Sequence, residues 1–282
     1  MDFDSSIALV TDSTADIPDD LVARHRIHVI ANIMVIDGES LEDGRGISRE
    51  EFYRRLPVMK QTPTTATAST GVYEELYERL LTQGFKHIVS IHAASALSGI
   101  FNAAHLAASN FGNQIHVIDS EQLSLGSGFQ VLAAAEAIAR GAPLEKVLEV
   151  ITNVQRRVRV IAMLDTLEYV RRSGRVSWAR ARLGSLLNIK PFVEVSAGKV
   201  LSIGESRTRN KGIERLKQLL INQGAIERLA LLHTNAEVDA RRIWEEIKNY
   251  TSLAESPPIV NITTIIGVHT GPNGLGFAVV RK

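Results

Sequence analysis

The chain has 282 residues and no cysteine, which excludes disulfides, thiol nucleophiles and thiolate metal sites. It has no apolar run near the roughly 18 residues that a membrane-spanning helix needs. Its net charge is only +1, so no overall field attracts nucleic acid or an anionic membrane. The first residues lack the basic and apolar regions of a secretion signal. These absences predict a cytoplasmic protein with no nucleic-acid partner and no stable membrane insertion.

Motifs for nucleotide and metal chemistry are also missing. The chain has no GxxxxGK[ST] phosphate loop, and the pair of glycines at residues 126–128 is not followed by the third glycine of a dinucleotide fingerprint. Four histidines lie at positions without ligand-like spacing, namely His87, His92, His105 and His116. We therefore expect no cofactor and no bound metal.

The order of β-type and helical segments predicts an α/β fold. In the first half the two kinds of segment alternate, which favours parallel βαβ units with helices on both faces of a sheet. The pattern changes near residue 157, where a hairpin and two amphipathic helices follow. We predict two α/β domains, residues 1–157 with a mostly parallel sheet and residues 158–282 with a mixed sheet and helices. A continuous strand is expected over residues 27–36, and two more over 260–266 and 275–280.

The segment VSIHAASALSGIFNAAHLAA, residues 89–108, carries the first candidate site. A short strand enters a turn of small and hydroxyl residues, and a helix opens after Ser98. The free backbone N–H groups and dipole of a helix N-terminus attract an anion, and Ser95 and Ser98 add donors. No Lys or Arg stands in this turn, which suits a single carboxylate held by neutral donors. The alternative is an ordinary capping serine.

A run of threonines, residues 62–70, precedes a predicted helix. Extended backbone places Thr65, Thr67 and Ser69 on one side of the chain. These hydroxyls would form a second wall of neutral donors around the anion. The alternative is a loop whose last hydroxyls cap the helix.

The glycine-rich segment GVHTGPNGLG, residues 267–276, is expected to be a loop between the last two strands. Its glycines allow close approach of the backbone to a ligand. His269 would donate a hydrogen bond to a carboxylate, or pair with it when protonated. The alternative is a solvated loop histidine.

Two basic clusters in the second half suit an acidic partner, because guanidinium groups pair well with carboxylate and phosphate. Few aromatic residues are interleaved with them and the chain has no excess positive charge, which argues against nucleic acid. Solvated helix faces are the alternative. The first cluster contains Arg171, Arg172, Arg175, Arg180 and Arg182, and the second contains Arg207, Arg209 and Lys211.

A serine acyl hydrolase is the competing enzymatic interpretation. It would use Ser98 as nucleophile, His269 as base and a carboxylate such as Asp12. The sequence Ala96-Leu97-Ser98-Gly99 lacks the first glycine of the GxSxG elbow, however.

Six stretches in order along the chain together resemble the DegV family of bacterial fatty-acid-binding proteins. They are LVTDSTADIP, HAASALSGIFNAA, VIDSEQLSLGSG, LDTLEYVRRSGRVS, LGSLLNIKPFVEVSAGK and IIGVHTGPNGLG. The resemblance implies two α/β domains (the EDD fold) with one long-chain fatty acid buried between them as the ligand. It also implies that the protein is a carrier and not an enzyme.

The resemblance further implies particular residue roles. The carboxylate would be bound by Thr65 and Ser98, with His269 beside it and with Ser95 and Thr67 as further donors. The TATAS sequence replaces the usual TSQPS-like segment, so Thr64 or Thr67 could take the place of Thr65.

The partner implied is an ATP-dependent fatty acid kinase, which makes acyl phosphate for phospholipid synthesis. Arg175 and Arg207 would contact it. A small-ligand sensor without a kinase remains a further alternative.

Overall fold

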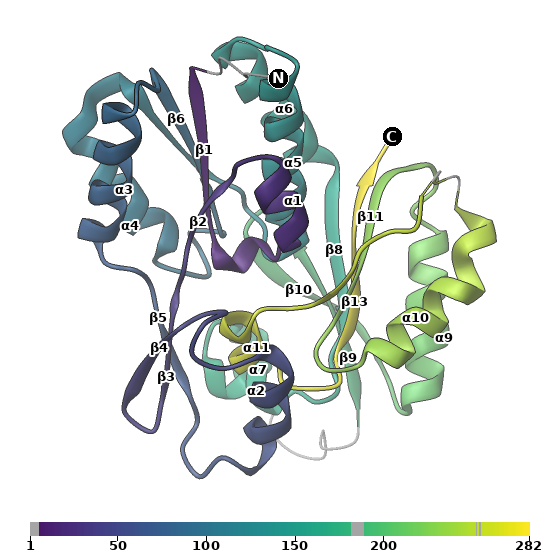
Figure 1. The fold of residues 1–282 in the computed structure, drawn as a ribbon. Helices are drawn as coiled ribbons and strands as arrows, with labels where there is room; N and C mark the ends of the chain where they lie inside the picture. Colours follow the sequence, from purple (N-terminus) through teal and green to yellow (C-terminus); the bar gives the residue numbers. More distant parts are fainter. Residues whose placement is uncertain (1–5, 182–188, 252, 254) are drawn as a thin grey trace.

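The computed structural model describes residues 6–181, 189–251, 253 and 255–282. Its first part contains a four-stranded parallel sheet in the order β2-β1-β6-β7 (Figure 1). Helices separate these strands along the chain, because parallel neighbours need a crossover connection. The strands are β1 (Ile7–Asp12), β2 (His28–Ile30), β6 (His87–His92) and β7 (Ile115–Asp119).

The second part contains a six-stranded mixed sheet in the order β10-β9-β8-β13-β11-β12. Only β11 and β12 pair in parallel. β9 and β10 form the expected hairpin, with Ala197 and Gly198 both at positive φ in its two-residue turn. The α/β fold class, with a parallel and a mixed sheet, is therefore confirmed. The strands are β8 (Val158–Met163), β9 (Lys190–Ser196), β10 (Lys199–Ser206), β11 (Ile226–His233), β12 (Ile259–Asn261) and β13 (Leu275–Arg281).

The single strand predicted over residues 27–36 is wrong. Asn32 interrupts it: its side chain is fully buried, and its Nδ2 donates to Asp12 Oδ1 at 3.1 Å. The run therefore divides into β2 in the parallel sheet and β3 in a small antiparallel sheet of order β4-β3-β5. These further strands are β3 (Ile33–Ile36), β4 (Glu39–Glu42) and β5 (Thr64–Ala66).

Helix α5 lies between the two large sheets (Figure 1). Twelve of its fifteen residues are buried, and its many alanines let both sheets approach closely. A Cβ on Gly128 would lie 2.6 Å from Ala15 O, and one on Gly126 would lie 2.5 Å from Val160 Cγ2. One hydrophobic core therefore joins the two parts, from Leu9 and Val89 to Val160 and Ala278. We retain the division into residues 1–157 and 158–282 as a proposal.

The helices of each part have the following bounds. In the parallel part these are α1 (Asp19–Arg24), α2 (Arg49–Arg55), α3 (Thr70–Thr82), α4 (Ile100–Ala108), α5 (Leu125–Ala139) and α6 (Leu144–Arg157). In the mixed part they are α7 (Glu168–Ser173), α8 (Ser177–Ala181), α9 (Arg209–Ile221), α10 (Glu237–Ile247) and α11 (Thr264–Thr270). Short 3₁₀ turns occur at Ser13–Ala15, Leu56–Val58, Ser109–Gln114 and Lys248–Tyr250. Among the described residues, none of the helices has the length and apolar character to span a bilayer.

Of the strand predicted over residues 260–266, only residues 260–261 belong to a strand, β12, and helix α11 replaces the end of the predicted strand and the loop that was to hold His269. Thr263 caps this helix, and its Oγ1 accepts a hydrogen bond from Ile265 N at 3.2 Å. Its β-branched residues Thr264, Ile265 and Ile266 favour a strand locally, but all three are buried in the core. Tertiary packing outweighs so weak a local preference.

Candidate functional site

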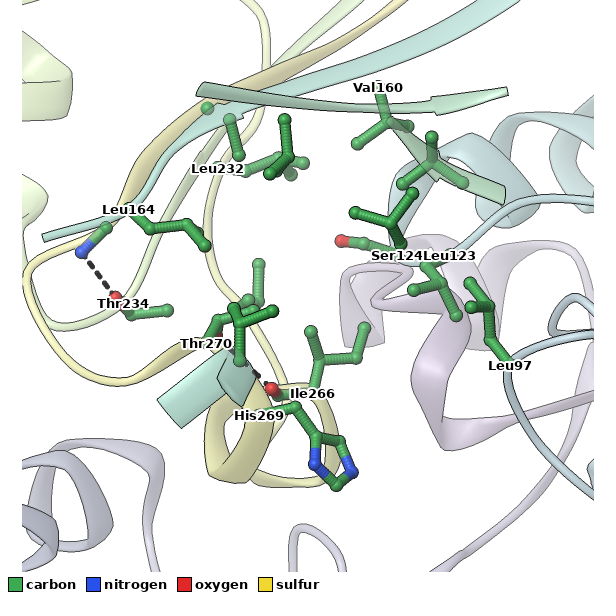
Figure 2. Close-up of a pocket in the computed structure, with 18 of the residues that line it drawn as sticks. Leu97, Leu123, Ser124, Val160, Leu164, Leu232, Thr234, Ile266, His269 and Thr270 are labelled. Carbon is green, nitrogen blue, oxygen red and sulfur yellow. Dashed lines mark hydrogen bonds between the residues drawn. The ribbon is translucent and has the colours of Figure 1, made fainter. Parts of the chain in front are cut away.

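A largely apolar cavity lies between the two sheets. Its empty space amounts to about 1190 Å³, counting the open mouth. Aliphatic side chains from the mixed sheet, from α7 and α11 and from the turns of the parallel sheet face this space (Figure 2). They include Val160, Leu164, Val193, Leu232 and Ile266. A cavity with this lining suits an apolar molecule.

Three of the predicted donors line this cavity together: Thr65, Ser98 and His269. Thr65 is positioned by β5, where it pairs with Met34 of β3. His269 is positioned by the last turn of α11. Thr65 Oγ1 and His269 Nε2 are 3.4 Å apart, a weak hydrogen bond. Residues 204 positions apart in sequence thus form one polar edge of an apolar space.

His269 is held in its neutral form. Burial, and secondly the positive charge of Arg175, lower its pKa to about 4. A neutral imidazole has one N–H donor and one acceptor nitrogen. Its Nδ1 is buried without a hydrogen-bond partner among the described residues. Neutral hydrogen bonding to a ligand is therefore favoured over the charged pair that the sequence left open.

Ser98 precedes the N-terminus of α4 and is half-buried. Its Oγ accepts a hydrogen bond from Ile100 N at 3.4 Å, which leaves the hydroxyl proton for another acceptor. The turn itself is fixed by the bond from Ala94 N to Gln122 O at 3.0 Å. Ser98 is thus both a local cap and a cavity residue.

A buried pair supports this turn from below. His92 Nδ1 lies 2.9 Å from Asp12 Oδ2, and Ala93 N donates to the same oxygen at 3.3 Å. Burial works to raise the pKa of Asp12, but the hydrogen bond and charge of His92 outweigh it, and the pKa is lowered. The Asp12 carboxylate is therefore engaged with His92 and not with His269. This contradicts the hydrolase arrangement of Ser98, His269 and Asp12.

Ser95 and Thr67 lie beside the cavity and not in its lining. Ser95 N donates to the carboxylate of Asp119 at 3.2 Å, so Ser95 helps to shape the turn. The methyl group of Thr67 lies 3.7 Å from the position a Cβ would take on Gly99. Among the alternatives for the threonine run, Thr64 is exposed and absent from the lining, whereas Thr65 is part of it. A direct ligand role for Ser95 and Thr67 stays a prediction.

Of the two candidate partner residues, Arg175 lines the cavity and Arg207 does not. Both are exposed, and Arg207 lies in the turn between β10 and α9. Arg175 Nη1 donates to Ser173 O at 3.0 Å. The turn that carries Ser98 contains no Lys or Arg, but Arg175 brings a positive charge to the mouth of the cavity. Arg182 lies outside the described residues, and so does the side chain of Arg180.

Sequence reasoning missed the hydroxyl residues Thr14, Ser124 and Thr270, which also line the cavity. No motif distinguishes them from ordinary capping residues, and the aliphatic lining looks like core. The positive φ of Ser124, which only the structure reveals, is the one local signal of a special position. No group of three or more metal-ligating side chains occurs in the part of the chain that the structure describes.

An α/β fold with a largely apolar cavity edged by Thr65, Ser98 and His269 is typical of proteins that bind small molecules, and comparison with known proteins identifies the family. The family model of the uncharacterised DegV family matches residues 6–282, so the chain belongs to the DegV family. It is 34% identical to a DegV domain-containing protein of Caldanaerobacter subterraneus, over 98% of this chain and 99% of the relative.

Two solved structures are close in both sequence and fold. One is a DegV family protein from Thermus thermophilus described for its fatty acid binding, with a TM-score of 0.91 and 30% identity. The other is DegV of Bacillus subtilis, described as a fatty acid binding protein, with a TM-score of 0.86 and 32% identity. In each case the match covers 98% of this chain and 99% of the other.

Proposed function

We propose that this protein binds one long-chain fatty acid and presents its carboxylate to a partner fatty acid kinase. The observation that carries the proposal is the position of Thr65, Ser98 and His269 on an otherwise apolar cavity. The fatty acid binding described for the proteins of Thermus and Bacillus supports it.

The tail supplies most of the affinity in this proposal. Each CH₂ group taken out of water contributes about 0.8 kcal/mol. Most side chains that β8, β9 and β11 contribute to the cavity are apolar, and His233 at the end of β11 is the polar exception. The cavity therefore selects for a long apolar chain.

The carboxylate is held by neutral donors. A buried carboxylate is costly unless it accepts hydrogen bonds, and the hydroxyls of Thr65 and Ser98 with His269 N–H provide them. Arg175 adds a favourable charge at the mouth, but water screens it because the side chain is exposed. Without a buried cation clamped on it, the carboxylate keeps its nucleophilicity toward a phosphoryl group. We therefore assign the protein the role of a carrier and the chemistry to its partner.

Arg175 and Arg207 are the residues proposed to contact the kinase. Both project from exposed positions, and a guanidinium group suits the carboxylates of an acidic docking surface. Arg209, their neighbour, is unsuited because it is bound to Asp239 Oδ2 at 2.6 Å and to Asn273 O at 2.7 Å.

The ligand proposal is tested by denaturing the purified protein and measuring extracted fatty acid by mass spectrometry. We expect about one fatty acid per chain in the wild type and a loss of most of it in Thr65→Ala and Ser98→Ala. Thr82→Ala, an exposed threonine at the end of α3, is the matched control and should retain the lipid. Unchanged lipid in both site variants would refute the site assignment.

The partner proposal is tested with ATP and a fatty acid kinase from the same host. At equal lipid loading, we expect acyl phosphate with the wild type and much less with Arg175→Ala and Arg207→Ala. Arg45→Ala, in an exposed pair with Glu42, serves as the control. Lipid binding without acyl phosphate formation would favour the sensor alternative.

A further inference from the structure

A buried acidic cluster lies next to the cavity and has no part in binding the fatty acid head group. Its centre is Asp16, whose side chain is fully buried in the turn after β1. Arg49 Nη1 lies 3.0 Å from Asp16 Oδ1. A second carboxylate, Asp43, accepts hydrogen bonds from the hydroxyls of Thr263 and Thr264. We call these three charged residues the Asp16 cluster.

Asp16 holds two walls of the cavity at once. Its Oδ2 accepts a hydrogen bond from Ser124 Oγ at 2.7 Å, and Ser124 lines the cavity before α5. Its Oδ1 accepts one from Thr263 N at 2.8 Å, at the N-cap of α11. Helix α11 carries Ile265, Ile266 and His269 into the cavity (Figure 2). One carboxylate thus connects the turn that carries Ser124 to the helix that carries His269.

The backbone of Ser124, in one wall of the cavity, is strained. It has φ 50° and ψ −144°, a conformation that non-glycine residues rarely adopt. Such strain persists only when the surroundings hold it, and it gathers at ligand sites and switches. The Ser124 carbonyl accepts hydrogen bonds from Ser127 N and Gly128 N at 3.0 Å, and the bond from its hydroxyl to Asp16 fixes its side chain. Asp16 is itself at positive φ, so the whole connection depends on tertiary contacts.

From this geometry we infer that Asp16 is a positioning residue for the fatty acid cavity, and that its charged form holds the cavity in its binding shape. This inference rests on the proposed function. Protonation of Asp16 removes the counter-charge of Arg49 and turns one of its two oxygens into a hydroxyl donor, although Ser124 Oγ and Thr263 N each donate to one of these oxygens. The strained wall and the start of α11 then lose the contact that orders them.

The charges around Asp16 place this change in an accessible pH range. Burial raises its pKa to about 6, although Arg49 and the hydrogen bonds from Ser124 and Thr263 oppose the rise, and Asp43 adds to it. Tyr53 of α2 also faces the cluster and stays protonated, because burial raises its pKa well above the usual range. Asp19 of α1 interacts with Arg49 from the solvent side.

The test measures ligand affinity of the delipidated full-length protein at about pH 7.5 and about pH 5, which bracket the titration of Asp16. The probe is dodecanesulfonate, because its head group stays ionised throughout, unlike that of a fatty acid. His269 titrates below this range. We expect the wild type to bind about fivefold more weakly at about pH 5, as proton linkage gives if the ligand lowers the pKa of Asp16 by about one unit from about 6.

Asp16→Asn mimics the protonated form. Like the protonated carboxyl, its amide has a single acceptor oxygen for the two donors Ser124 Oγ and Thr263 N, and it lacks the charge for Arg49. We expect it to bind weakly, with the same affinity at both pH values. Asp20→Asn, an exposed carboxyl on α1, is the matched control and should keep the wild-type pH dependence. If Asp16→Asn does not fold, the wild type provides the test. The ¹³C chemical shift of the Asp16 carboxyl, followed against pH with and without ligand, gives its pKa, which ligand binding should lower.

Three results would overturn the inference. The first is an affinity of the wild type that does not change with pH, and the second is a pH dependence that survives in Asp16→Asn. The third is an Asp16 pKa that the ligand does not lower. If the wild type binds neither dodecanesulfonate nor a fatty acid at either pH, the proposed function itself fails, which is a distinguishable result.

Discussion

The ring of Tyr53 lies directly over Gly267. A Cβ on this glycine would be 2.7 Å from Tyr53 Cε1 and Cζ, closer than any real contact. The ring cannot move aside easily, because it is fully buried and its Oη donates to Ile262 O at 3.0 Å. This contact fixes how α11, and with it His269, sits against α2.

We therefore predict that Gly267→Ala destabilises the protein by about 1–3 kcal/mol through overpacking. Urea unfolding would measure the loss. Gly71→Ala, whose Cβ would meet nothing closer than Ser69 Oγ at 3.9 Å, is the control and should be neutral or slightly stabilising. Equal stability of the Gly267 and Gly71 variants would contradict the packing argument.

A second prediction concerns the stability contributed by His269. Its pKa in the folded protein, about 4, lies below the unfolded value of 6.5. The unfolded chain therefore binds the proton more readily, so His269 makes stability fall as pH decreases from about 6.5 toward about 4. The loss amounts to about 1–3 kcal/mol.

In His269→Gln this part of the pH dependence should disappear. The check is urea unfolding of both proteins at several pH values, with the exposed His105→Gln as control. Asp16 is present in both proteins, so the difference between their curves reports His269 alone. The raised pKa of Asp16 makes its own contribution to stability increase as pH falls, which is the opposite direction. Parallel stability curves for wild type and His269→Gln would disprove the assignment.

A third prediction concerns the support of the Ser98 turn by Asp12. Replacing Asp12 by Ala leaves His92 and Asn32 without their buried acceptor, which should cost about 3–5 kcal/mol. Glu237→Ala, which breaks an exposed pair with Arg241, should cost less than about 1 kcal/mol. Chemical denaturation distinguishes the two, and a double-mutant cycle with His92→Leu isolates the pair.

A fourth prediction concerns the length of the fatty acid tail. Val193 of β9 lines the cavity and is buried, so Val193→Phe should occupy space meant for the distal part of a chain. The lipid extracted from the variant should shift to shorter chains, or decrease in amount, when analysed by mass spectrometry. Leu201→Phe, an exposed residue of the adjoining β10, should leave the lipid unchanged. An unaltered chain-length profile in Val193→Phe would contradict this use of the cavity.

Local sequence predicted most helices closely. The sequence Ser48-Arg49-Glu50-Glu51 has the spacing of a capping box, and Ser48 Oγ accepts a hydrogen bond from Glu51 N at 3.1 Å. The Ala-rich run after Ser124 is typical of a helix, and α5 occupies Leu125–Ala139. These elements are set by capping and by the spacing of apolar residues, which are local properties. The continuous strands predicted over residues 27–36 and 260–266 are wrong in part. An apolar β-branched run favours a strand locally, but it does not show which distant segments will pack against it.

The sequence by itself determined the α/β class, the positions of most elements and the identity of the hydroxyl and histidine donors. Only the tertiary structure decided which of them meet. In it Thr65 lies beside His269, Arg175 lines the cavity, and Asp12 is hydrogen-bonded to His92. The reason is physical. A candidate such as Ser98 is visible as a residue type in a turn, but the cavity it faces is built from aliphatic side chains that look like core. Whether such side chains meet one another or enclose a space depends on packing between distant segments.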